Sequence, residues 1–273
     1  MNLRTDFETR KKEIEAYFEL LQFLDSSTTE NRLSNTEAQT FTIDLDLYKV
    51  MKANTFLMLY NLMEGTVVEG LNTIFLHINE QGLERKELSE LYQIIWLEYK
   101  SNLIKKLESL KPDQYNPFAP YLLSNAIQDL DIFEVKDFKP KPNPKEQNPT
   151  LNADLSGYNA YIELVGKDIS GNLDAREIRK LFPKYGINIE DVALIVEDAD
   201  DTRDETRLDT KHILKVKNYR NKLAHGEESY TKIGAREGFF EINKIRKHVF
   251  KYLDEIVDSI ENFLNDEKYK KSQ

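Results

Sequence analysis

The sequence ANTFLMLYNLMEGTVV, residues 53–68, is the stretch that decides the fold of this chain. Glu64 is the only charged residue in it, and it lies within a longer segment, 45–79, whose composition is typical of a helix. A helix that is apolar on nearly every side has to be buried among other elements. We therefore expect 45–79 to form a long helix whose middle, 53–68, is buried on most sides.

Four other segments have the apolar spacing of helices. Residues 6–25 and 236–265 each place large apolar side chains on one stripe, which is typical of a helix that packs against a core. Residues 85–109 have a similar spacing, and a further helix is expected from about 208 to the glycine at 226. Together these segments predict an all-α fold, a helical bundle built from the first three and the last two long helices.

The stretch between the third and fourth long helices differs in composition. A Pro/Lys segment, KPKPNPK at 139–145, is expected to be extended and exposed. Residues 172–182 are expected to form a short capped helix that Pro183 and Gly186 end, and 190–196 a short helix or a strand. The regions that we expect are N-terminal helices at 1–110, a mixed, mostly helical insertion at 111–205, and C-terminal helices at 206–273.

Composition excludes several classes of protein. The chain has no cysteine, which rules out disulfides, thiolate zinc sites, iron–sulfur clusters and cysteine nucleophiles, and which fits a reducing cytoplasm. Residues 1–8 carry charges and lack the apolar segment of a signal peptide. No run approaches the roughly 18–20 apolar residues that a membrane span needs. We therefore expect a cytoplasmic protein that has no membrane partner.

The formal net charge of −10 does not by itself indicate nucleic-acid binding. Positive charge is nevertheless concentrated near 211–225 and again near 246–251. A basic patch on an acidic protein can hold a polyanion, although such a patch is also typical of a solvated helix face. The first window contains Lys211, Lys215, Lys217, Arg220 and Lys222 with His212 and His225, and the second contains Arg246, Lys247 and Lys251.

The motif RNKLAH, residues 220–225, places a permanent cation and a titratable imidazole five residues apart. Arginine fits phosphate oxygens and histidine carries protons near neutral pH, so the pair suits phosphodiester cleavage without a metal. Five residues of helix turn by about 140°, so Arg220 and His225 do not share a face, whereas Asn221 and His225 do. Two chains across a two-fold axis would bring both motifs to one cleft. The two histidines could then act as base and acid on RNA, whose 2′-hydroxyl is the nucleophile.

The pattern Arg-Asn-x-x-x-His at the end of a helix in an all-α chain resembles the Arg-x4–6-His motif of the HEPN superfamily. Residues 59–66, 170–174, 178–179 and 216–226 are similar to a bacterial HEPN-like nuclease family that is associated with toxin and phage-defence loci. The resemblance implies a HEPN-like helical bundle that dimerises with both motifs in one cleft. It also implies metal-independent endoribonuclease activity, with RNA as the substrate and no cofactor.

The resemblance assigns roles to individual residues. It implies that Arg220 and His225 are the catalytic pair, that Asn221 is the polar residue that follows the arginine, and that Glu64 is the acidic residue of a neighbouring helix. One subgroup has, two residues after the histidine, a tyrosine that accepts adenylylation; here Glu227 stands there, so that form of regulation is not expected. Because an unrestrained ribonuclease would harm its host, we expect an antitoxin or another regulatory partner. Further contacts to RNA are expected from Lys217, Lys222 and Tyr230.

Other interpretations fit the same residues. A non-catalytic HEPN-like module could bind RNA, a nucleotide or a protein, a scaffold could use the helical faces, and the acidic residues at 197–204 could serve metal-dependent DNA cleavage. Arg220 and His225 could also be a cation pair at the carbonyl end of a helix. Glu64 could be a buried carboxylate that pairs with a structural arginine or lysine, of which Arg220 is one candidate. A calcium loop at 168–179 is rejected because its register fails. Asn172 or Asp174 is better explained as a helix cap.

Overall fold

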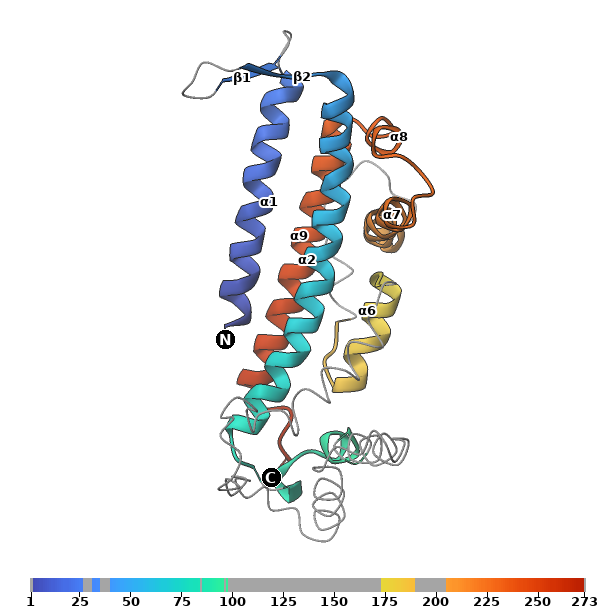
Figure 1. The fold of residues 1–273 in the computed structure, drawn as a ribbon. Coiled ribbons are helices and arrows are strands. Elements are labelled where there is room, and N and C mark those ends of the chain that lie inside the picture. The colour runs from blue at the N-terminus through green and yellow to red at the C-terminus, as the bar shows by residue number, and fades with distance from the viewer. Residues whose placement is uncertain are drawn as a thin grey trace, which may run out of the picture. The chain divides into compact units, whose positions relative to one another are not determined.

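The computed structural model describes residues 2–26, 31–34, 40–83, 85–95, 97, 173–189 and 205–272. Its elements are α1 (Leu3–Ser26), β1 (Asn31–Ser34), β2 (Thr40–Ile43), α2 (Leu45–Glu80), a 3₁₀ turn (Arg85–Glu87), α6 (Ala175–Leu181) with a 3₁₀ extension (Phe182–Tyr185), α7 (Glu205–Ala224), α8 (Tyr230–Gly234) and α9 (Phe239–Asn265) (Figure 1). The described residues fall into two compact units. Those within Met1–Gly70 and Ile169–Ser259 form unit 1, and those within Leu71–Asp168 and Ile260–Gln273 form unit 2.

The all-α prediction is confirmed. The helices predicted at 6–25 and 45–79 are α1 and α2, the helix predicted from about 208 is α7, and the last predicted helix is α9. Of the helix predicted at 85–109, the structure describes the 3₁₀ turn and helical residues at 90–95. The predicted Pro/Lys segment, the element at 190–196 and the acidic cluster at 197–204 lie outside the described residues. Most of the insertion at 111–205 also does, so the three expected regions stay a prediction.

Three elements were not predicted from the sequence: the strands β1 and β2 and the short helix α8. Strands β1 and β2 pair antiparallel in a hairpin whose register sets Asn31 opposite Ile43. The strand TFTI alternates threonine with apolar residues, which is a pattern typical of a short strand. The five-residue helix α8 precedes α9, so α9 begins at Phe239 rather than at 236.

The core of unit 1 lies between α1, α2 and α9, which run side by side (Figure 1). The hydroxyl of Tyr17 on α1 donates to the carbonyl of Met51 on α2 at 2.9 Å, and the rings of Phe18 and Phe239 lie 6.3 Å apart. The predicted stripe of α1 is buried as expected, and the apolar stretch 53–68 supplies the most deeply buried side chains of α2. These buried residues include Phe7, Ile14, Phe18, Leu21 and Leu24 of α1, Phe56, Leu59, Tyr60 and Met63 of α2, and Ile242, Ile245, Val249, Leu253 and Ile256 of α9.

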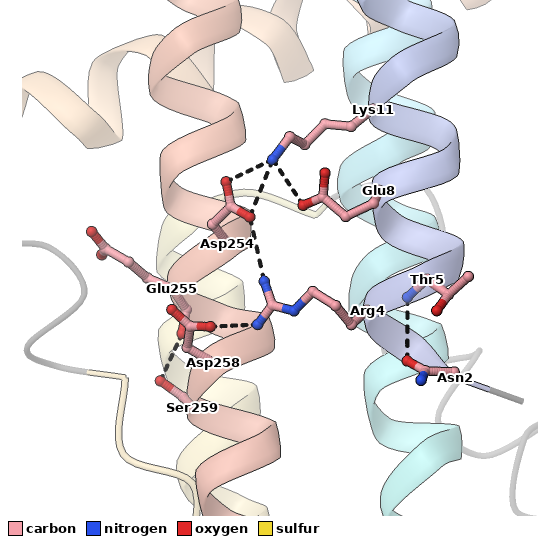
Figure 2. A network of polar contacts seen from close by, with 9 residues as sticks. All are labelled: Asn2, Arg4, Thr5, Glu8, Lys11, Asp254, Glu255, Asp258 and Ser259. Carbon is pink, nitrogen blue, oxygen red and sulfur yellow. Dashed lines mark hydrogen bonds and ion pairs between the residues drawn. The ribbon is translucent and has the colours of Figure 1, made fainter.

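A network of charged side chains joins α1 to α9 at the surface of unit 1 (Figure 2). The ammonium of Lys11 lies 3.0 Å from a carboxylate oxygen of Asp254 and 3.0 Å from one of Glu8, while Arg4 contacts both Asp254 and Asp258. These side chains are partly exposed, and exposed ion pairs contribute at most about 1 kcal/mol each. The network therefore links α1 to α9 and contributes little to stability.

The short helices α6 and α8 hold α7 in unit 1. Asp174 caps α6 by accepting from the backbone amides of Arg176 and Glu177 at 2.9 and 3.0 Å, which confirms the capping prediction. Helix α8 is so close to α2 that a Cβ at Gly234 would lie 1.8 Å from the backbone oxygen of Lys49. α6 is thus capped by a neighbouring side chain, and α8 is held by a close approach to the backbone of α2.

Unit 2 contains the end of α2 and of α9. His77 and the hydroxyl of Tyr269 lie 3.1 Å apart, and the amide of Ser89 donates to the carbonyl of Tyr269 at 2.9 Å. Tyr269 is fully buried, so it anchors the segment that follows α9. Within the described residues no helix combines the length and the apolar character that crossing a bilayer requires.

Candidate active site

The motif at 220–225 occupies the last turn of α7, which is regular helix up to Ala224. Gly226 follows with a φ of 68°, a left-handed conformation that glycine adopts without strain. The amide of Gly226 donates to the carbonyl of Leu223, and the amide of Glu227 donates to the carbonyl of Lys222 at 2.9 Å. This pair of bonds is the Schellman motif that ends many helices. The predicted stop at Gly226 is confirmed, and His225 is left as an exposed side chain at the helix terminus.

Arg220 lies against the ring of Tyr60, a residue of α2. Its Cζ is 4.3 Å from the ring centre, and its Nη1 donates to Oδ1 of Asn221 at 3.1 Å. Tyr60 is fully buried, and its hydroxyl accepts from the backbone amide of Leu173 at 3.1 Å. A cation over a fixed aromatic face is attracted to it. The guanidinium is therefore positioned by a ring and an amide, and within the described residues no carboxylate forms an ion pair with it.

Glu64 lies on α2 one turn after Tyr60 and is half-buried. Burial raises the pKa of Tyr60, and the charge of Glu64 raises it further, whereas Arg220 and the amide of Leu173 lower it. Glu64 and Arg220 thus act on the same phenol, but they form no ion pair with each other within the described part of the chain. The interpretation of Glu64 as the buried partner of Arg220 is not supported. Its role as a supporting acidic residue stays a prediction.

The two lysines predicted to contact RNA are engaged inside unit 1. The ammonium of Lys217 lies 2.7 Å from Asp174, and that of Lys222 lies 2.7 Å from Glu228. Burial disfavours ionisation of Asp174, but the bonds from Lys217 and from two backbone amides outweigh it, so its pKa lies below the usual value. Tyr230, the third predicted contact, is 37% exposed at the first residue of α8. The contacts of all three with RNA stay predictions.

Two carboxylates near the motif were missed in the sequence. Glu228 accepts from Lys222 and Arg236 and lies 3.6 Å from Lys232. Glu237 binds the ammonium of Lys215 at 2.7 Å and accepts from the hydroxyl of Tyr219 at 2.8 Å. Only the spacing of Glu228 and Lys232, four residues apart where α8 begins, gave a local signal.

Burial and the contact with Glu237 raise the pKa of Tyr219 to about 12, so this phenol stays protonated at neutral pH. Together with Glu228, Glu237 offsets much of the positive charge of the basic window. That window is therefore less cationic in the folded chain than its sequence suggests.

A groove of about 460 Å³ lies beside the motif on α7. Its lining residues are Lys211, Leu214, Lys215, Asn218, Tyr219, Asn221 and Lys222 of α7 with Glu227 of the following turn. Asn221 thus faces a concave surface, and its side-chain oxygen is the atom that accepts from Arg220. The side-chain amide of Asn221 therefore lines the groove and also accepts a hydrogen bond from the guanidinium of Arg220.

His212 does not lie on the exposed side of α7. It is 7% exposed, and its ring stacks on that of His248 from α9 with 4.3 Å between the ring centres. Burial, and then the charges of His248 and nearby lysines, lower the pKa of His212 to about 4. Its imidazole is therefore neutral in the folded protein at physiological pH, and it belongs to the packing of α7 on α9.

The described residues contain no group of three histidine, aspartate or glutamate side chains close enough to bind a metal ion. In chemical terms the site offers an arginine with one side-chain hydrogen bond within the described residues, an amide that accepts this bond, and an exposed imidazole just after the end of α7. α7 is regular through 220–224, and helix geometry sets positions 220 and 225 about 140° apart around its axis. By this geometry, the two side chains of one chain do not share a helix face.

No curated protein and no solved structure matches this chain significantly. A family model does match it: that of the HEPN_MAE_28990-like HEPN family, over residues 1–269. The match spans nearly the whole chain, including the apolar core of α2, the capped helix α6 and the motif at the end of α7. Its all-α fold agrees with the helices described above. The chain therefore belongs to the HEPN_MAE_28990-like HEPN family.

Proposed function

We propose that this protein is a metal-independent endoribonuclease that is active as a homodimer. The observation that carries the proposal is the state of Arg220, which is held on the ring of Tyr60 and by Asn221 and is not neutralised by a carboxylate within the described residues. A guanidinium positioned in this way is ready to bind a phosphate. His225 is exposed immediately after the end of α7 and can exchange protons with a bound substrate.

A dimer would bring to one phosphate the arginine and the histidine that a single chain holds on different sides of its helix. Since Arg220 and His225 do not share a helix face, a two-fold axis near the end of α7 would bring two arginines and two histidines to one phosphate. One imidazole takes the proton of the ribose 2′-hydroxyl, whose oxygen attacks phosphorus. The other imidazole gives a proton to the departing 5′-oxygen. The products are a 2′,3′-cyclic phosphate and a 5′-hydroxyl, and the arginines stabilise the charge that develops on the phosphate oxygens.

The biological setting that we propose is that of a cytoplasmic toxin or phage-defence effector. Such a nuclease requires restraint, which an antitoxin or another regulatory partner would supply. Family membership and the arrangement at Arg220 support this proposal.

The test is cleavage of single-stranded RNA by the purified protein in the presence of EDTA. We expect the wild-type chain to cleave, and His225→Ala and Arg220→Ala to lose cleavage while keeping their circular dichroism spectrum and their molar mass in solution. Lys12→Ala, which removes an exposed lysine of α1, is the matched control and should cleave normally. Cleavage that EDTA abolishes, or that survives His225→Ala, contradicts the mechanism.

A second candidate function is a non-catalytic module that binds RNA, a nucleotide or a protein. It is favoured by the divergence of Arg220 and His225 within one chain, because binding needs the arginine alone. This alternative predicts RNA binding that Arg220→Ala weakens, with no product from any RNA. Cleavage by the wild-type chain and not by His225→Ala excludes it.

A further inference from the structure

The groove on α7 is not used by the Arg220–His225 pair. Seven of its lining residues lie on α7 at intervals of three and four, so they form one continuous face of the helix. From Lys211 to Lys222 this face is about 16 Å long. The next position on it, four residues after Asn221, is His225. The groove therefore leads along the helix to the proposed catalytic histidine.

The side chains of the groove differ in charge and polarity along its length. Lys211, at its far end, is exposed, and within the described residues it has no carboxylate partner. Lys215 and Lys222 are held in place by Glu237 and Glu228 at 2.7 Å. Leu214, which is 44% exposed, adds an apolar surface.

Two amide side chains complete the surface. Asn218 is exposed, and Asn221 lies half-buried next to Arg220. The groove thus offers a cation for a phosphate, amides for base edges and an apolar contact for a base.

We infer that this groove is a subsite for the single-stranded RNA that flanks the scissile phosphate, with Lys211 as a phosphate contact and Asn218 as a contact to a base. The inference rests on the proposed function, because it takes RNA as the ligand. Amides and an exposed leucine can reach bases only when the bases are unpaired, so the subsite selects single strands over duplexes. Its length admits a short run of nucleotides rather than one phosphate.

A second copy of the chain is a less suitable occupant. In a two-fold contact the same surface would meet itself, so the lysines of one groove would face those of the other. Lys211 has no carboxylate to offset it within the described residues, and like charges that face each other oppose association. Lys215 and Lys222 are paired with Glu237 and Glu228, and Glu227 lines the other end of the groove, so the charge that favours a polyanion such as RNA lies at the Lys211 end.

The first arm of the test measures binding, independently of cleavage. Fluorescently labelled single-stranded RNA is titrated with His225→Ala alone and with His225→Ala that also carries Lys211→Ala, Asn218→Ala or the control Lys12→Ala. We expect the first two additions to weaken binding several-fold and the control to have no effect. Loss of one phosphate contact should also lower the slope of log affinity against log salt by about 0.7.

The second arm measures cleavage of a long single-stranded RNA and of a dinucleotide that carries the same scissile step. In chains that retain His225, Lys211→Ala and Asn218→Ala are expected to raise KM for the long RNA and to leave kcat/KM for the dinucleotide unchanged. An equal effect on both substrates overturns the subsite, as does RNA affinity that is indifferent to Lys211. Dissociation of a dimer by Lys211→Ala would show instead that the groove is a protein interface.

The two arms separate the two proposals. If no RNA is cleaved but binding depends on Lys211, the nuclease proposal fails and the subsite stands. If RNA is cleaved in a His225-dependent way but neither groove variant changes binding or KM, the nuclease proposal stands and the subsite fails.

Discussion

His212 gives a prediction whose magnitude follows from the structure. Its ring is 7% exposed and stacks on His248, and its pKa is lowered from 6.5 to about 4 by burial, then by His248, Lys244, Lys215 and Lys211. The unfolded chain therefore takes up a proton near pH 6.5, whereas the folded chain resists it down to about pH 4. Between these values the unfolded state binds more protons, so the protein loses stability as the pH falls.

The size of this effect can be worked out from the two pKa values. They lie about 2.5 pH units apart, and each unit corresponds to about 1.4 kcal/mol. The full loss is therefore about 3 kcal/mol, reached below pH 4, and about 2 kcal/mol of it should appear between pH 7 and pH 5. Above pH 6.5 the contribution of this group to the pH dependence fades, because the unfolded-state imidazole gradually loses its proton.

The variant that tests this reasoning is His212→Phe, which keeps a planar ring against His248 and removes the titration. The free energy of unfolding in urea, followed by far-UV circular dichroism, is compared at about pH 7 and about pH 5. We expect the wild-type chain to lose about 2 kcal/mol more than the variant between the two pH values. Ile213→Val, a packing change at the next buried residue, should lower stability by about 1 kcal/mol equally at both. A wild-type loss no larger than that of His212→Phe would refute the reasoning.

Three further predictions concern the elements that hold α7. Gly234→Ala places a Cβ 1.8 Å from the α2 backbone and should cost about 1–3 kcal/mol, whereas Gly238→Ala, with nothing within 4 Å, should cost little; similar melting temperatures would contradict the close approach. Asp174→Ala removes a helix cap and should cost about 1–2 kcal/mol in urea unfolding, and Asp174→Asn, which keeps a capping oxygen, should cost less. A double-mutant cycle of Tyr60→Leu with Arg220→Met should give a coupling free energy of about 1 kcal/mol, and a value near zero would mean that the ring does not hold the guanidinium.

Much of the fold was predictable because its signals are local. The apolar stripe of α1 and the largely apolar middle of α2 are patterns within single helices, and their large apolar side chains are mostly buried. The end of α7 follows from the positive φ of Gly226, and the start of α6 follows from the capping side chain of Asp174. Both features depend on only a few neighbouring residues. The hairpin of β1 and β2 was missed because strands of four residues carry only a brief alternation.

The motif at 220–225 was also visible in the sequence, since its two residue types and their spacing carry the chemistry. The contacts that surround the motif in the folded chain were not visible in the sequence. Tyr60 and Arg220 are separated by well over a hundred residues, and only the packing of α2 beside α7 brings the ring under the guanidinium. The stacking of His212 on His248 depends in the same way on α7 meeting α9.

Local periodicity, caps and composition therefore determined which segments are helices and where the candidate chemistry lies. Tertiary structure decided which charges are neutralised and which remain available. Lys217 and Lys222 are paired with Asp174 and Glu228, whereas Arg220 has no carboxylate partner within the described residues. The physical reason is that a charge's surroundings are set by whichever distant segments pack against it, and no pattern within one helix encodes that choice.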